Sequence, residues 1–301
     1  MSESSTYENI AIVINPAAGL EEPILKTLNN VFRKYDANWQ VAVTNRAGDG
    51  RRLAREAVER GADVVAVYGG DGTVMEVSGG LVGTDVPLAI LPGGTGNVMS
   101  VELGIPRDLS RAAELLFDPD RKIRPVDVGQ IKEHYFMLRA SVGFEAAVVR
   151  KTTRDLKDRF GLLAYGFAIL EALNEPLHAH YRLTLDGQEV ETEGFSLLIA
   201  NAGSIGRLNL VLHSAIKPDD GLLDVMMLNT RPETLVSMAA SVVQLDEFAA
   251  ALQHWQAREV RVESTPRQTV QGDGELFCDT PVVARVVPGA VRVIVPGYTL
   301  H

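Results

Sequence analysis

Three glycine-rich turns hold the residues of this chain that could carry out chemistry. They lie at residues 15–19 (Asn-Pro-Ala-Ala-Gly), 69–73 (Gly-Gly-Asp-Gly-Thr) and 92–97 (Pro-Gly-Gly-Thr-Gly-Asn). Glycine lets backbone amides approach phosphate oxygens closely, and the amino terminus of a following helix favours an anion. One such turn often does no more than reverse the chain. Three of them, with Asp, Thr and Asn side chains between the glycines, predict a phosphate-binding site.

The position of these turns follows from the elements around them. Apolar runs predict buried strands, and the stretches between them predict helices, with Asp49 as an N-cap and Gly61 as a helix end. The expected strands are 10–14, 39–43, 64–68 and 87–91, and the expected helices are 21–35, 49–60 and 73–81. Uniformly apolar strands that alternate with helices predict a parallel sheet covered on both faces. Ligands bind such sheets at the carboxyl ends of the strands, where all three turns lie.

From about residue 124 the pattern changes to strands in succession. The expected strands are 126–131, 135–142, 181–185, 194–201, 223–228, 259–263, 269–271, 276–278, 282–287 and 290–295, with helices at 161–174 and 232–255. This pattern is typical of an antiparallel β-rich domain. The sequence therefore predicts an α/β protein with a parallel-sheet nucleotide-binding domain at 1–125 and an antiparallel β-rich domain at 126–295. The tail at 296–301 could return to the first domain.

Composition limits the classes to which the chain can belong. Its 301 residues suit two domains at about 150 residues each. A net charge of −10 argues against non-specific nucleic-acid binding, which needs Lys and Arg to neutralise phosphates. Cys278 is the single cysteine, so no intramolecular disulfide can form. The polar start of the chain is unlike a signal peptide, and no apolar run approaches the about 18 residues of a membrane span. We expect a cytoplasmic protein without a transmembrane segment.

Several well-known nucleotide and metal signatures do not occur in the sequence. There is no GxxxxGK[ST] of a P-loop, no GxGxxG after the first expected strand, and no protein-kinase motif set. There is also no HExxH and no cysteine cluster for zinc.

A family resemblance starts from residues 68–73, Tyr-Gly-Gly-Asp-Gly-Thr. This segment resembles the signature of the diacylglycerol kinase catalytic-domain family, which includes sphingosine kinases and bacterial lipid kinases and is distantly similar to NAD kinases and phosphofructokinases. Further matching segments follow in the order found in the family, at 15–19, 94–97, 143–146, 217–225 and 272–275. The ordered set covers nearly the whole chain and is more specific than any one segment.

The resemblance implies ATP and Mg²⁺ as cofactors and assigns a role to each matching residue. Asp71 would lie near the magnesium ion and the transferred phosphoryl group, and Glu275 matches the proposed general base. The nucleotide-binding set would be Asn15, Pro16, Gly19, Thr44, Gly69, Gly70, Asp71, Gly72, Thr73, Gly94, Thr95 and Asn97. By chemistry alone either carboxylate could accept the proton of an acceptor hydroxyl. The resemblance favours Glu275.

Residues 217–224 match a structural magnesium loop. Asp220 would give a carboxylate, and Lys217 and Leu222 would give backbone carbonyls. Taken alone, the acidic pair after Pro218 is better explained as a solvated turn, and Glu275 as a turn carboxylate beside an Asp-Gly pair. The ordered set favours the functional interpretation.

Four departures from the family pattern bear on positioning and on the acceptor. Met75 replaces an Asn and Val98 an Asp near the nucleotide turns, Glu145 replaces an Asp, and the expected contiguous glycines are reduced to Gly203 and Gly206. None of these changes removes a phosphate-turn glycine, Asp71 or Glu275.

The sequence thus predicts an ATP- and Mg²⁺-dependent lipid kinase of phospholipid metabolism. It would transfer the γ-phosphate to the hydroxyl of diacylglycerol or a related lipid, presented at or near a membrane surface. Residues 160–170 could line the acceptor site or form an ordinary buried helix. An NAD-kinase-like small-molecule kinase and a catalytically decayed nucleotide- or lipid-binding protein are the alternatives. Dimerisation, common in the family, has no sequence signal here.

Overall fold

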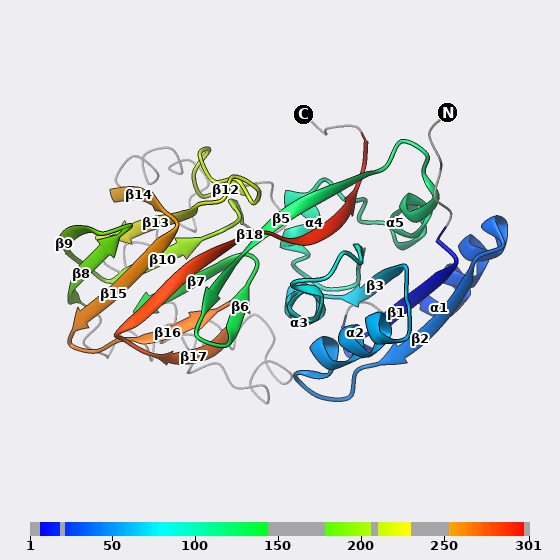
Figure 1. Cartoon of the computed structure of the whole chain (residues 1–301), viewed down its shortest axis with the longest axis horizontal. Helices are drawn as coiled ribbons and strands as arrows, with labels where there is room; N and C mark the ends of the chain where they lie inside the picture. Colours follow the sequence, from blue (N-terminus) through cyan, green and yellow to red (C-terminus); the bar gives the residue numbers. More distant parts are fainter. Residues whose placement is uncertain (1–6, 19–21, 144–177, 206–209, 230–252, 298–301) are drawn as a thin grey trace. The chain divides into compact units, whose positions relative to one another are not determined.

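A computed structural model describes residues 7–18, 22–143, 178–205, 210–229 and 253–297. The chain divides into two compact units, both drawn in Figure 1. The first comprises Met1–Val128, Ser204–Val211 and Pro288–His301, and the second comprises Gly129–Gly203 and Leu212–Val287. Residues 204–211 and 288–295, which fall in the second domain of the sequence-based division, therefore group with the first unit.

The first unit is built on a parallel sheet with the strand order β2-β1-β3-β4-β18. Its strands are β1 (Asn9–Ile14), β2 (Asn38–Val43), β3 (Val64–Gly69), β4 (Leu88–Pro92) and the last part of β18 (Val282–Val295). β3 and β4 are buried along their whole length, which explains their uniformly apolar sequences. The predicted parallel sheet is confirmed. The parallel pairing of Val293 of β18 with Leu88 of β4 was not predicted.

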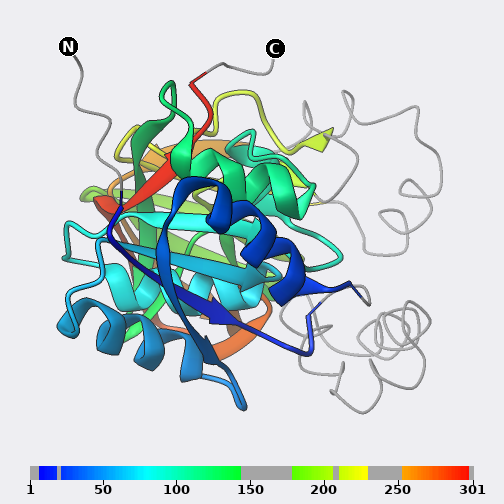
Figure 2. The same cartoon turned by 90° about the vertical axis from the view of Figure 1, so that its right-hand side faces the viewer.

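Helices cover both faces of this sheet, as Figure 2 shows. α1 packs against α5, and α2 packs against α3, on opposite faces. On the α1 face, Phe32 contacts the rings of Trp39 and Phe117 edge to face. The bounds are α1 (Ile24–Phe32), η1 (Arg33–Tyr35), α2 (Asp49–Glu59), α3 (Asp71–Leu81), α4 (Val98–Glu102), α5 (Leu109–Glu114) and η2 (Leu115–Phe117).

The second unit is an antiparallel β-sandwich, which confirms the predicted β-rich class. One sheet has the order β14-β13-β10-β7-β16-β17, and the other strands follow β18-β15-β8-β9. Apolar side chains of both layers, among them Val142, Leu183 and Val225, form one core. The bounds are β7 (Arg139–Gly143), β8 (Ala179–Leu185), β9 (Gln188–Gly194), β10 (Ser196–Ala200), β13 (Leu223–Leu228), β14 (Gln253–Ala257), β15 (Glu259–Thr265), β16 (Thr269–Gly272) and β17 (Glu275–Asp279).

Shorter elements complete the description. β5 (Lys122–Ile131) passes from the first unit into the second and pairs there with β6 (His134–Phe136), and β11 (Ser204–Ile205) pairs with β12 (Leu210–Val211). No helix in the described part of the chain is long and apolar enough to cross a membrane.

Four local predictions were wrong. The strand expected at 135–142 is β6 and β7 with a break between them, and the strands expected at 282–287 and 290–295 are the single strand β18. The end of the helix expected at 232–255 is strand β14, because Trp255 packs on the sandwich core while its neighbours His254 and Gln256 bind Asp224. Residues 230–252 lie outside the described part.

The fourth error concerns the start of α2. Gly48, with φ of 85°, is the N-cap residue instead of Asp49. The Asp49 carboxylate accepts the N–H groups of Asn45 and Arg46, which precede the helix, so it stabilises the turn before α2. Gly61 follows the helix with φ of 81°, as expected for a glycine that ends a helix.

Candidate functional site

The three glycine-rich turns lie together at the carboxyl edge of the parallel sheet in the first unit. The Asn15 N–H donates to the Tyr68 carbonyl over 2.9 Å, and the Gly93 N–H donates to the Gly69 carbonyl over 3.0 Å. The Asn15 side-chain amide also donates to the Thr73 hydroxyl over 2.9 Å. These bonds join the first turn to the second and the second to the third. Gly19, the last residue of the first turn, lies outside the described residues.

The second and third turns touch backbone to backbone. A Cβ atom added to Gly94 would lie 2.4 Å from the Cα of Gly70, a distance at which real Cβ contacts do not occur. Asn97 fixes the third turn, because its side chain accepts the Gly94 N–H over 2.9 Å and donates to the Gly94 carbonyl over 2.8 Å. Two backbone segments therefore run side by side at an edge where a phosphate could bind.

Asp71 lies where α3 begins, beside the third turn. One carboxylate oxygen accepts the N–H of Met99 over 3.2 Å, in the first turn of α4. A Cβ atom on Gly96 would come within 2.8 Å of the other oxygen. The carboxylate thus links the second and third turns and is half-buried.

Gly72 differs from the other glycines of these turns. It is exposed, its φ angle is one that any residue adopts, and an added Cβ would meet no atom within 4 Å. Nothing in the described part of the chain requires glycine at this position. A ligand that approaches the backbone closely would give such a reason.

The Tyr68 side chain packs beneath the glycine-rich turns, a role that was not predicted from the sequence. Its ring lies so close to Gly93 that a Cβ there would be 2.6 Å from the ring. Its hydroxyl donates to the Glu22 carboxylate, beyond the first turn, over 2.6 Å. Burial, together with the hydrogen bond to Glu22, raises the pKa of the Tyr68 phenol.

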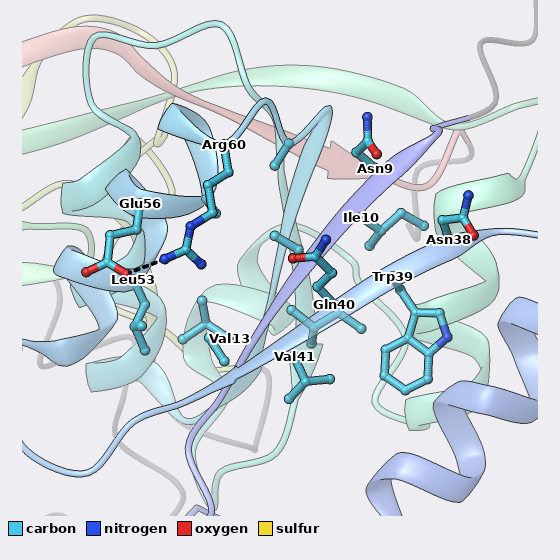
Figure 3. A pocket seen from close by; sticks show the side chains of 15 residues that line it. Asn9, Ile10, Val13, Asn38, Trp39, Gln40, Val41, Leu53, Glu56 and Arg60 are labelled. Atoms are coloured by element: carbon cyan, nitrogen blue, oxygen red, sulfur yellow. Dashed lines mark hydrogen bonds and ion pairs between the residues drawn. The ribbon is translucent and has the colours of Figure 1, made fainter.

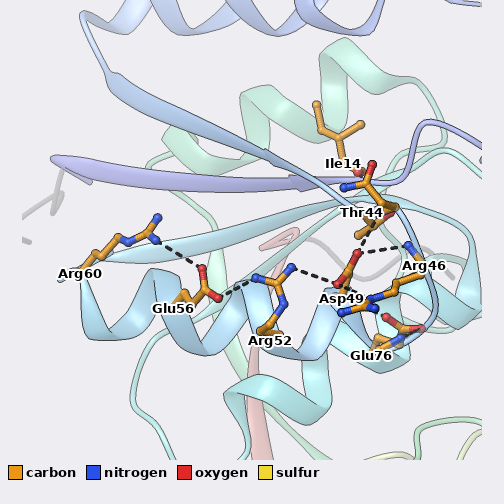
Figure 4. Close-up of polar contacts among 11 residues, drawn as sticks. Ile14, Thr44, Arg46, Asp49, Arg52, Glu56, Arg60 and Glu76 are labelled. Carbon is orange, nitrogen blue, oxygen red and sulfur yellow. Dashed lines mark hydrogen bonds and ion pairs between the residues drawn. The ribbon is translucent and has the colours of Figure 1, made fainter.

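A second network holds the connection between β2 and α2, drawn in Figure 4. The Thr44 N–H donates to the Ile14 carbonyl over 2.9 Å. Hydrogen bonds from the Asn45 backbone and the Arg52 side chain lower the pKa of Asp49 to about 2. Glu76, on α3, accepts the N–H groups of Gly48 and Gly50, each over 2.9 Å.

Glu76 therefore ties the helix that starts at the second turn to the loop that follows Thr44. No sequence signal marked Glu76, because its partners are backbone amides 26 and 28 residues away.

In the second unit, Glu275 begins β17 after a two-residue turn. Asp273 and Gly274 both have positive φ, 48° and 87°, as in the tight turns that suit β-hairpins. The Asp273 carboxylate accepts the N–H groups of Met137 over 2.7 Å and of Arg139 over 2.9 Å, and that of Leu138 as well. Burial raises the pKa of Asp273 to about 6, against these N–H groups, which favour the ionised form. Glu275 itself is exposed.

The predicted magnesium loop is a turn in the second unit. The Leu222 N–H donates to the Asp220 carboxylate over 3.0 Å, and Gly221 has φ of 74°. Asp220 and Lys217 are exposed. Within the described residues no cluster of three or more His, Cys, Asp or Glu side chains could hold a metal ion. The predicted site needs one carboxylate and two carbonyls, so it stays a prediction.

The remaining predicted positions are distributed as follows. The nucleotide-binding set and Asp71 belong to the first unit, and Glu275 and the magnesium loop belong to the second. Met75 and Val98, the two departures near the turns, are both buried. Glu145, Gly206 and the candidate acceptor wall at 160–170 lie outside the described residues.

A pocket of about 400 Å³ lies elsewhere in the first unit, between β1, β2 and α2 (Figure 3). Leu53 and Val13 give it apolar walls, and Gln40 and the ion pair of Glu56 with Arg60 lie at its border. None of the predicted site residues lines it. We therefore place the candidate site at the turns and not in this pocket.

Comparison with known proteins identifies two family models along the chain. Residues 9–131 match the diacylglycerol kinase catalytic domain, and residues 139–295 match the YegS C-terminal NAD kinase beta sandwich-like domain. The chain is 33% identical over 265 residues to the diacylglycerol kinase of Mycobacterium tuberculosis, covering 84% of this chain and 83% of that protein.

Two further proteins resemble the chain over nearly its whole length. It is 34% identical over 302 residues to a Pseudomonas syringae pv. tomato protein named "Probable lipid kinase YegS-like", covering 97% of this chain and 95% of that protein. The crystal structure of a diacylglycerol kinase from Bacillus anthracis has the same fold, with a TM-score of 0.76 at 24% identity, covering 97% of this chain and 98% of that one.

Proposed function

The chain belongs to the diacylglycerol kinase family of lipid kinases, and we propose that it transfers the γ-phosphate of ATP to the hydroxyl of diacylglycerol or a related lipid. The observation that carries the proposal is the contact between the turns at 69–73 and 92–97. A Cβ at Gly94 would overlap Gly70, whereas a Cβ at Gly72 would meet only open space. The turns are thus packed tightly against each other and remain open on the side where backbone amides could face phosphates.

The residues of the first unit suit ATP and Mg²⁺. Phosphoryl transfer depends mainly on positioning and on neutralising charge, so backbone amides and a metal-proximal carboxylate are the parts that it needs. In this proposal Asp71 holds the magnesium ion that accompanies the nucleotide. Asn15, Thr44 and Asn97 fix the turns and the loop around the nucleotide through the hydrogen bonds described above.

Glu275 is the group that we propose to take the proton of the acceptor hydroxyl. The hydroxyl oxygen forms a bond to the γ-phosphorus, the bond from that phosphorus to the bridging oxygen breaks, and ADP leaves. Glu275 is exposed and carries no other assigned task, whereas Asp71 already accepts an amide of α4. A carboxylate that is free to approach the acceptor suits general-base work.

The turn at Asp220 offers a further magnesium site. Its donors would be the Asp220 carboxylate and the carbonyls of Lys217 and Leu222, which are the hard oxygen ligands that Mg²⁺ prefers. The Leu222 N–H already orients the carboxylate, so the turn is organised before a metal binds. We propose a structural role for this ion.

Two alternative functions differ from this proposal in the acceptor that would be phosphorylated. The likeness of residues 139–295 to an NAD kinase sandwich-like domain keeps an NAD-directed kinase in view. A decayed protein would bind ATP but transfer nothing. Transfer of labelled γ-phosphate with Mg²⁺ to dispersed diacylglycerol, sphingoid bases and NAD distinguishes all three, and lipid presented on vesicles tests whether the enzyme works at a membrane surface.

Two variants test the residue roles. Asp71→Ala should abolish transfer without unfolding the chain, because it removes a half-buried carboxylate from the edge of the sheet. Glu275→Gln should lower kcat on the order of 100-fold or more and leave the ATP KM nearly unchanged. Full activity of a folded Asp71→Ala protein would refute its role, and an unchanged kcat for Glu275→Gln would move the general base elsewhere.

A further inference from the structure

The hairpin turn that leads into Glu275 is held by a segment far away in sequence. Met137 and Leu138 connect β6 to β7, and Arg139 begins β7. Their three consecutive N–H groups all donate to the Asp273 carboxylate, over donor–acceptor distances from 2.7 to 3.2 Å. The Asp273 N–H in turn donates to the Arg139 carbonyl over 3.0 Å. Hydrogen bonds to a charged acceptor are stronger than those between neutral groups.

The segment at 137–139 is itself fixed from its other side. The N–H groups of Asn201 and Ala202 donate to the Leu138 carbonyl over 2.9 and 3.1 Å. The Asn201 side-chain amide donates to the Met137 carbonyl over 2.9 Å. The acceptor groups and the donor groups of this connection are therefore both engaged, and Asp273 binds a rigid part of the sandwich.

A second side chain holds the other residue of the turn. Gln271 is buried, and its side-chain oxygen accepts the Gly274 N–H over 2.8 Å. Its side-chain nitrogen donates to the Ser141 hydroxyl over 2.7 Å, in the middle of β7. Both turn residues are thus anchored to β7 or to the connection before it.

Glu275 follows this turn directly, and its side chain has no hydrogen bond or ion pair within the described residues. Its place is therefore set through the backbone. We propose that Asp273, with Gln271 as second support, is the positioning residue that fixes the proposed general base. This inference rests on the proposed function. A general base must stand within hydrogen-bond reach of its proton, and a misplacement of about 1 Å can cost about 100-fold in rate.

The chain contains a matched control in a second hairpin. Asp186 and Gly187 form the turn between β8 and β9 with nearly the same φ angles, 47° and 88°. The Asp186 carboxylate also accepts consecutive backbone N–H groups, those of Arg258 over 3.0 Å and Glu259 over 2.8 Å. No predicted site residue adjoins this turn. Asp→Asn therefore makes the same chemical change in both hairpins, and only one of them carries Glu275.

The test is a comparison of Asp273→Asn with Asp186→Asn in the full chain, with thermal unfolding measured for each. We expect Asp273→Asn to lower kcat for lipid phosphorylation about 10- to 100-fold with the ATP KM within about twofold of wild type. Asp186→Asn should leave both within about twofold. In a Glu275→Gln background, Asp273→Asn should cost little further activity, because it acts through the residue already removed.

Each other outcome has a definite meaning. Equal kcat values for Asp273→Asn and Asp186→Asn would overturn the positioning role while the kinase assignment stands. The same holds if Asp273→Asn lowers kcat as much in the Glu275→Gln background as in the wild type. If Asp273→Asn does not fold, Ser141→Ala tests the proposal instead, because it removes only the hydrogen bond that holds the Gln271 side chain. A lower kcat at constant ATP KM supports the positioning role, and an unchanged kcat overturns it. A wild-type chain that phosphorylates no lipid would refute the proposed function, and this inference with it.

Discussion

Gly72→Ala separates a glycine kept for the fold from one kept for a ligand. In the structure the added methyl group meets nothing within 4 Å, and the φ angle at Gly72 is unstrained. The residue is the second of α3, where alanine is a better helix former than glycine by up to about 1 kcal/mol. The folded first unit should therefore be as stable as in the wild type or slightly more stable.

Nucleotide affinity should change in the opposite direction. A methyl group on an exposed phosphate turn keeps phosphate oxygens away from the neighbouring amides. The loss of one amide bond to a charged group costs about 1.5–3 kcal/mol, and each 1.4 kcal/mol is about tenfold in affinity. We expect ATP to bind about 10- to 100-fold more weakly, measured by isothermal titration calorimetry alongside thermal unfolding.

Gly94→Ala is the contrasting variant. Its Cβ would lie 2.4 Å from the Cα of Gly70, so it should lower the melting temperature as well as ATP affinity. If Gly72→Ala binds ATP as tightly as the wild type, the phosphates do not approach the turn at 69–73. The inference that Gly72 is a glycine because a ligand approaches it would then be refuted. If Gly72→Ala unfolds, the stated freedom around its Cβ is wrong.

Two further predictions concern stability. Glu22→Ala should destabilise the first unit by about 1–3 kcal/mol, because it leaves the buried Tyr68 hydroxyl unpaired, whereas Tyr68→Phe should cost only about 0.5–1.5 kcal/mol, because the exposed Glu22 carboxylate regains water. Trp39 fluorescence during urea unfolding, measured in a Trp255→Phe background, reports the stability of this unit. A larger loss for Tyr68→Phe than for Glu22→Ala would contradict the burial argument. Because the pKa of Asp273 is raised to about 6, the folded chain binds more protons than the unfolded chain between about pH 4 and 6. The contribution of Asp273 to the free energy of unfolding is therefore full below that range and falls as pH rises through it, by at most about 3 kcal/mol. Asp273→Asn should remove this decline, and a pH profile of unfolding that is the same in the variant and the wild type would refute the raised pKa.

The sequence predicted the parts of the fold that have a local cause. The apolar strands β3 and β4 are buried along their length, and the turns after them lie at the carboxyl edge as expected. The pairing of Val293 with Leu88 has no local cause, because nothing in residues 282–295 distinguishes a strand that pairs in parallel at one end and antiparallel at the other. For the same reason two strands were expected where one exists.

The candidate site was predicted at the level of motifs but not of supports. Asp71 and the glycines of the turns belong to recognisable segments. Glu76, Glu22 and Asp273 act through bonds to groups between 26 and 136 residues away, and no spacing rule connects them. Asp49 shows the same limit at short range, since its type and place suited a helix cap but its carboxylate binds the preceding loop.

The late return of β18 to the first unit bears on how the chain folds as it is made. The path passes between the units after residues 128, 203, 211 and 287, so neither unit is one continuous stretch of sequence. Among the strands that the structure describes, β4 has no neighbour on its outer side until Val293 has been synthesised. Until then a buried, apolar strand presents an unpaired edge. The sheet that begins with β1 is therefore completed only after the strands of the second unit have been synthesised, and a fragment ending near residue 131 would keep that edge open.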